Sequence, residues 1–158
     1  MLPKIEWKFP SSLAVDRNAT SMPIGDGPLV VRFGSGLAFP CEGYTDSVLI
    51  VAEMWLDELI RAAASRRPKL EFEFFDSPDK IRVTDVDGKN ETIALLPAGK
   101  RRGTLETGCT FREFSSCVSG WLNAVASAAT SELGAEALCV QSFRKRLASL
   151  PTDNARNP

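Results

Sequence analysis

Residues 69–96 have the sequence KLEFEFFDSPDKIRVTDVDGKNETIALL. Apolar side chains alternate with charged ones from Leu70 to Phe74, and Ile81 and Val83 alternate with polar neighbours in the same way. Alternation with a period of two is typical of a strand that has one buried face. A third run that favours strands, Thr92–Leu96, follows. Three consecutive strands of this kind predict an antiparallel meander.

The connections around these strands have the composition of tight turns. Residues Asp76–Asp79 (DSPD) predict a turn, because proline presets φ and an aspartate side chain hydrogen-bonds the turn backbone. Asp87 and Gly88 predict a hairpin turn before the third strand. After a loop at 97–103, residues 104–107 predict a fourth strand.

The N-terminal part is predicted to contribute two further strands. Residues Lys4–Phe9 alternate charged and apolar side chains and predict a strand that ends at Pro10. The segment 10–28 is rich in Ser, Asp, Asn, Gly and Pro without sustained periodicity, so we expect a long surface loop there. Residues Leu29–Phe33 predict the second strand, and 34–44 are expected to be irregular.

A first helix is predicted between these two groups of strands. We expect it to begin at Thr45 or Asp46, since either side chain can cap the first turn, and to end near Ala64. Its wide apolar stripe indicates packing on a sheet along most of its length. The charged residues expected mostly off this stripe are Glu53, Asp57, Glu58 and Arg61.

The C-terminal part is predicted to be helical. Thr110 and Glu113 match a capping box, which predicts the start of a helix. Gly134 is predicted to end this helix. A last helix is expected at about 135–150, and residues 152–158 are expected to form a flexible tail. The side of the last helix expected to be buried carries Leu138, Phe143, Leu147 and Leu150.

Strands followed by helices predict an α+β fold, a mostly antiparallel sheet with helices packed on one face. The length of 158 residues and the 44% hydrophobic content fit a single domain, 1–158.

Nineteen basic residues against twenty acidic ones give a net charge of −1, which argues against a dedicated nucleic-acid binder. The sequence contains no histidine, which removes the usual general base and the middle member of Ser-His and Cys-His catalysis.

The sequence also lacks the motifs of common cofactors. Cys41, Cys109, Cys117 and Cys139 are scattered, without the paired spacing of a zinc site. Residues 34–36 (GSG) follow a strand, but no third glycine and no Lys-Ser or Lys-Thr pair completes a phosphate loop. No signal peptide or membrane-spanning stretch is recognisable, so we expect a cytoplasmic protein without a cofactor, metal or membrane partner.

Two groups of residues could still carry chemistry without histidine. Glu71 and Glu73 share one face of a strand about 7 Å apart, a spacing that glycoside hydrolysis can use. Cys109 is a candidate thiol nucleophile. The alternative is a purely structural role, in which both carboxylates face water and the cysteines are small core residues. A third interpretation is a subunit of a larger assembly, which an uncovered apolar patch near Phe39 or Trp7 would support.

Acidic residues are concentrated in the middle of the chain. Residues 41–91 contain twelve acids and seven bases, a local net charge of −5. Such a surface can attract a basic partner through complementary potential, although ordinary solvation of an exposed sheet face explains the same pattern. The acids expected to gather on the exposed face of the meander and its turns are Glu71, Glu73, Asp76, Asp79, Asp85 and Asp87.

The segments VLIVAEMWLDELI (48–60), KLEFEFF (69–75), KIRVTDV (80–86) and ETIALL (91–96) follow one another in a recognisable layout. This layout resembles that of small bacterial immunity proteins, which neutralise polymorphic or contact-dependent growth-inhibition toxins. The resemblance covers residues 41–96 and carries over no catalytic residue. It implies an inhibitor, not an enzyme, whose partner is a basic toxin domain such as a nuclease, bound through the acidic meander.

Overall fold

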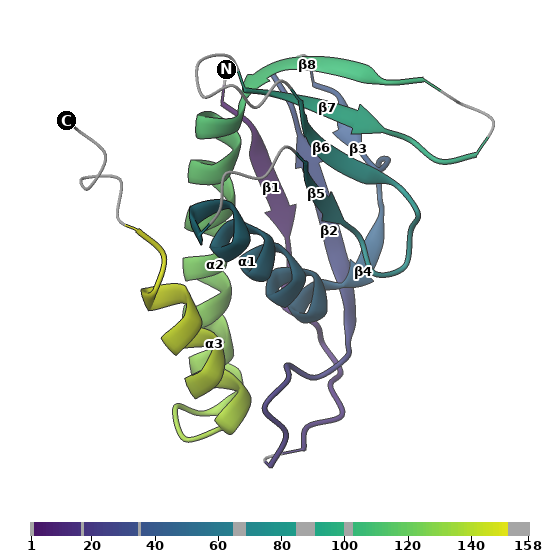
Figure 1. The fold of residues 1–158 in the computed structure, drawn as a ribbon. Coiled ribbons are helices and arrows are strands. Elements are labelled where there is room, and N and C mark those ends of the chain that lie inside the picture. Colours follow the sequence, from purple (N-terminus) through teal and green to yellow (C-terminus); the bar gives the residue numbers. More distant parts are fainter. Residues whose placement is uncertain are drawn as a thin grey trace.

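The computed structural model describes residues 2–16, 18–34, 36–64, 69–84, 91–99 and 103–151. In these residues three helices accompany two four-stranded antiparallel sheets (Figure 1). The predicted α+β class is confirmed, with the strands divided between two sheets. The elements are β1 (Lys4–Trp7), β2 (Asp26–Arg32), β3 (Ala38–Phe39), β4 (Thr45–Ser47), α1 (Val48–Ala64), β5 (Leu70–Glu73), β6 (Lys80–Thr84), β7 (Thr92–Leu96), β8 (Leu105–Thr110), α2 (Phe111–Leu133) and α3 (Leu138–Ala148).

The first sheet is built around β2, which pairs with β1, β3 and β4. The expected loop at 10–28 ends earlier than predicted, because β2 begins at Asp26 and its first residues pair with β4. Gly27 sits opposite Asp46 in this pairing, and a Cβ at Gly27 would lie only 2.8 Å from the Lys8 carbonyl oxygen. The close approach of three segments explains a glycine at this position.

The second sheet is the predicted meander, in the order β5-β6-β7-β8. Glu71 pairs with Arg82 and Glu73 pairs with Lys80 across the β5–β6 pair. The predicted fourth strand is confirmed and is longer than expected, since β8 continues to Thr110. The expected hairpin turn at Asp87 and Gly88 lies outside the described residues.

The start of α1 differs from the prediction. The helix begins at Val48, and Thr45 and Asp46 belong to β4 instead of capping the first turn. The predicted apolar stripe is confirmed by the burial of α1, but Glu58 is buried along with it, at 8% exposure. The reason is that Glu58 faces β5 and accepts a backbone hydrogen bond there.

The C-terminal helices largely match the prediction. Thr110 and Glu113 form the capping box in both directions, with the Glu113 N–H donating to Thr110 Oγ1 at 3.2 Å. Gly134 ends α2 with a φ of 91°, a value that suits glycine. Leu138 was expected to be buried but is 42% exposed, because α3 begins at this residue and turns Cys139, Val140 and Phe143 inward instead.

One core joins the helices to both sheets, and Trp55 of α1 lies completely buried within it. The Trp55 ring makes edge contacts with Phe72 and Phe74 on the β5 side and with Trp121 on α2. Phe39 is buried against Phe74, and Trp7 is half-buried against Trp121. Phe39 and Trp7 therefore belong to the core and its border, and an uncovered patch near them, as an assembly subunit would present, stays a prediction.

The helices share one side of the molecule in Figure 1, with α2 and α3 packed side by side and α1 crossing in front of α2. The strands of the meander extend away from them toward the other side. Within the described ranges, no helix has both the length and the apolar character needed to cross a membrane. The arrangement leaves α1 in contact with one edge of the meander, strand β5.

Candidate functional site

The first two predicted acids, Glu71 and Glu73, lie on the partly exposed face of β5, where basic residues of β6 pair with them. The Arg82 guanidinium approaches Glu71 Oε1 to 2.6 Å. Lys80 Nζ lies 3.2 Å from Glu71 and 2.6 Å from Glu73, so it bridges the two carboxylates. The Arg82 hydrogen bond lowers the pKa of Glu71 and keeps it ionised. The two acids and two bases make this part of the face locally neutral.

The acids of the β5–β6 turn have different roles. Asp79 holds the turn in place, because its carboxylate accepts hydrogen bonds from the Ala98 N–H at 2.6 Å and from the Ser77 hydroxyl. Asp76 lies beside this turn and is exposed. Partial burial and the nearby charges of Asp46 and Asp26 raise the pKa of Asp76. The predicted acids Asp85 and Asp87 lie outside the described residues.

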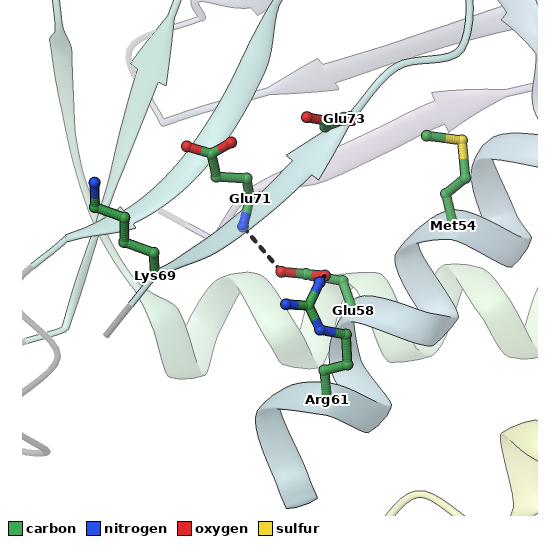
Figure 2. A pocket seen from close by; sticks show the side chains of 6 residues that line it. All are labelled: Met54, Glu58, Arg61, Lys69, Glu71 and Glu73. Carbon is green, nitrogen blue, oxygen red and sulfur yellow. Dashed lines mark hydrogen bonds and ion pairs between the residues drawn. The ribbon is translucent and has the colours of Figure 1, made fainter. Parts of the chain in front are cut away.

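A groove of about 390 Å³ runs between α1 and β5. Figure 2 shows Glu58 and Arg61 on the helical side, with Lys69 and Met54 toward opposite ends of the groove. Glu58 accepts a hydrogen bond from the Glu71 N–H at 3.0 Å and one from Arg61 at 2.9 Å. Glu71 and Glu73 complete the lining, so three carboxylates border the same groove.

Side chains of α1 and β4 cover the free edge of β5. Residues 71, 73 and 75 direct their backbone groups away from β6, as alternate residues of an antiparallel edge strand do. The Trp55 indole N–H donates to the Glu73 carbonyl at 2.7 Å, one step along the edge from the Glu58 hydrogen bond. Helix α1 thereby takes the place of a neighbouring strand, which fixes the groove wall and blocks edge pairing with another chain.

Asp46 continues this pattern beyond the end of β5. Its carboxylate is completely buried and accepts hydrogen bonds from the N–H groups of Phe75 at 3.1 Å and Asp76 at 3.2 Å. The Tyr44 hydroxyl and the Ser47 N–H donate to the same carboxylate, each at 2.7 Å. Sequence reasoning placed Asp46 at the helix start and missed this role, since the partners lie up to 30 residues away.

The three residues proposed for histidine-free catalysis do not converge on one point. Lys80 spans Glu71 and Glu73. Cys109 lies on β8, three strand spacings from β5, which corresponds to about 14 Å. Burial raises the pKa of Cys109 to about 11, and its thiol donates a hydrogen bond to the Thr110 carbonyl. The Cys109 environment therefore favours a protonated thiol at neutral pH.

Comparison with family models, curated proteins and solved structures gives no match. The chemistry of the site must therefore be inferred from its own residues. In the described ranges, no group of three or more Cys, Asp or Glu is arranged to hold a metal ion. Glu71 is already shared by Arg82 and Lys80, whereas the Glu73 carboxylate is 47% exposed beside Lys80 and retains acceptor capacity for another donor. This arrangement can bind the side chain of a basic residue.

Proposed function

We propose that the protein is an inhibitor of the immunity type, which binds a basic toxin domain in the cytoplasm and neutralises it. The α1–β5 groove is the observation that supports this proposal, because three carboxylates, those of Glu58, Glu71 and Glu73, border it against two basic side chains. The exposed Asp76 follows on the same hairpin. A basic side chain of the toxin would enter the groove and share these carboxylates, as an arginine fork does with paired oxygens.

The charge distribution gives this interaction its direction. The chain as a whole has a net charge of only −1, whereas residues 41–91 have −5. A local negative field of this kind accelerates the encounter with a basic partner and disfavours acidic ones. If the toxin is a nuclease, the carboxylates would occupy the place of substrate phosphates and so block its active site.

Co-expression with the toxin domain encoded in the neighbouring reading frame tests the proposal. We expect the protein to restore growth of the host and to co-purify with the toxin in a fixed ratio. Growth arrest despite expression of the folded protein, together with the absence of a complex, would contradict the proposal.

A matched pair of charge reversals then locates the surface. Asp76→Lys is expected to slow association and weaken binding, because it places a positive charge on the proposed interface. Glu132→Lys makes the same change of charge at an exposed position on α2 and should leave binding nearly unchanged. Equal effects of the two variants would assign the binding to another surface.

A further inference from the structure

Two consecutive phenylalanines at the end of β5 have opposite environments. Phe74 is 4% exposed and packs its ring against Phe39, Tyr44 and Trp55. Phe75 is 48% exposed and is the one aromatic side chain among the exposed large hydrophobic residues of the described ranges. The core therefore does not account for Phe75.

The backbone that carries Phe75 is held in place from inside the protein. Asp46 accepts the N–H groups of both Phe75 and Asp76, and its carboxylate is completely buried. Tyr44 and Ser47 fix this carboxylate from the other side. Burying a charge is costly unless it is fully hydrogen-bonded, and here the hydrogen bonds fix an exposed turn. An aromatic side chain on a fixed backbone loses little conformational entropy when it binds.

The charge around Phe75 specifies the chemistry of its partner. Asp76 follows it directly and is exposed, and the Glu73 side chain, two residues earlier, is 47% exposed in its ion pair with Lys80. Partial burial raises the pKa of Asp76, and the nearby negative charges of Asp46 and Asp26 raise it further. A partner that covers the turn must place positive charge at its rim to be complementary.

We propose that Phe75 is the apolar anchor of the toxin interface and inserts into an apolar pocket of the toxin domain whose rim carries Arg or Lys. This inference rests on the proposed function and names the kind of surface that the toxin presents. An aromatic residue in a desolvated pocket, surrounded by polar contacts that exclude water, is the typical arrangement of an interface hot spot. Asp76 would meet the basic rim in this arrangement.

The dissociation constant of the complex with the neighbouring toxin domain tests the anchor. Phe75→Ala is expected to weaken binding by about 30-fold or more, mainly through faster dissociation. Leu138→Ala is the matched control, because Leu138 is also an exposed apolar residue, at 42%, but lies at the start of α3. We expect this control to change binding by about twofold or less.

A second variant at the same position keeps the test independent of small folding effects. Phe75→Lys places a positive charge against the basic rim and should weaken binding more than Phe75→Ala, with the unfolding midpoint of both variants close to that of the parent. If both Phe75 variants bind the toxin domain as tightly as the parent, and the parent protects host growth, the anchor role of Phe75 is overturned. The immunity proposal itself would then still hold. Failure of the parent itself to bind or protect would overturn both.

Discussion

At the scale of single residues, Asp46 links the most distant parts of the site. Its carboxylate accepts four hydrogen bonds, two of them from a turn about 30 residues away. Each hydrogen bond to a buried charged group contributes more than a neutral one, and an unpaired buried N–H is costly. The position of the Phe75–Asp76 turn therefore depends on a single side chain.

Replacing this carboxylate tests its structural role. Asp46→Asn is expected to lower the free energy of unfolding by about 3 kcal/mol, because the amide NH₂ group would face backbone donors instead of accepting from them. Urea unfolding of the two proteins measures the difference. Asp57→Asn is the control, since Asp57 is 58% exposed in its ion pair with Arg146 and should cost less than about 1 kcal/mol. Equal losses in both variants would contradict the role of Asp46.

The cysteines give a second prediction at this scale. Cys41 is exposed, whereas Cys109 is buried with a pKa raised to about 11. Iodoacetamide at pH 8 is therefore expected to alkylate Cys41 in the folded protein and to leave Cys109 unmodified, because only an accessible thiolate reacts. Mass spectrometry of peptides identifies the labelled residue, and labelling in urea shows that all four thiols can react. Equally fast alkylation of Cys109 in the folded state would restore it as a candidate nucleophile.

Local and distant interactions differed in how well the sequence predicted them. The Thr110–Glu113 capping box was predictable, because its partners are three residues apart and depend only on helix geometry. The roles of Asp46 and Glu58 were not, because the backbone N–H groups that donate to these carboxylates lie 13 to 30 residues away and come close only when the chain folds. No local signal marked Phe75 as exposed, since it follows Phe74 at the point where the alternation ends.

At the scale of elements, strand β5 positions the site through both of its edges. One edge pairs with β6. Along the other edge Trp55 donates a hydrogen bond to β5 and Glu58 accepts one from it, and Asp46 accepts one just beyond the end of the strand. Periodicity predicted β5, β6 and β7 because each has alternating or strand-favouring residues. Strands of two or three residues, such as β3 and β4, are too short to show a period. The start of α1 was misplaced for this reason.

The cross-strand ion pairs give a prediction about pH. The Arg82 hydrogen bond lowers the pKa of Glu71 in the folded state, so the pair stabilises the fold above the ordinary glutamate pKa of 4.5. This contribution is lost as the pH falls through the lower native pKa. Glu71→Gln is therefore expected to cost about 0.5–1 kcal/mol at pH 7 and progressively less below about pH 4.5. Urea unfolding at several pH values measures the difference, and a difference that does not vary with pH would contradict the pairing.

At the scale of the whole molecule, two sheets share one core, and the meander is attached to the rest through α1, α2 and the Trp55 ring cluster. Sequence composition and element order were sufficient for the α+β class, because amphipathic elements must bury one face. The division into two sheets was not predictable, since it depends on the pairing of β2 with β1, across a long loop, and with β3 and β4, which are too short to show a period. Binding, as proposed, would use the sheet edge where the two parts meet.

The proposed interaction predicts how the complex responds to salt. In the proposed complex, steering by the negative charge of residues 41–91 would act over distances that ions screen, whereas contacts in the groove and around Phe75 would be short and shielded from solvent. We expect the association rate with the toxin domain to fall about tenfold or more between low and high ionic strength, with a much smaller change in the dissociation rate. Stopped-flow mixing over a salt series measures both rates, and Asp76→Lys should flatten the dependence while Glu132→Lys, on α2, leaves it nearly parent-like. An association rate that is insensitive to salt would show that the acidic surface does not steer the toxin.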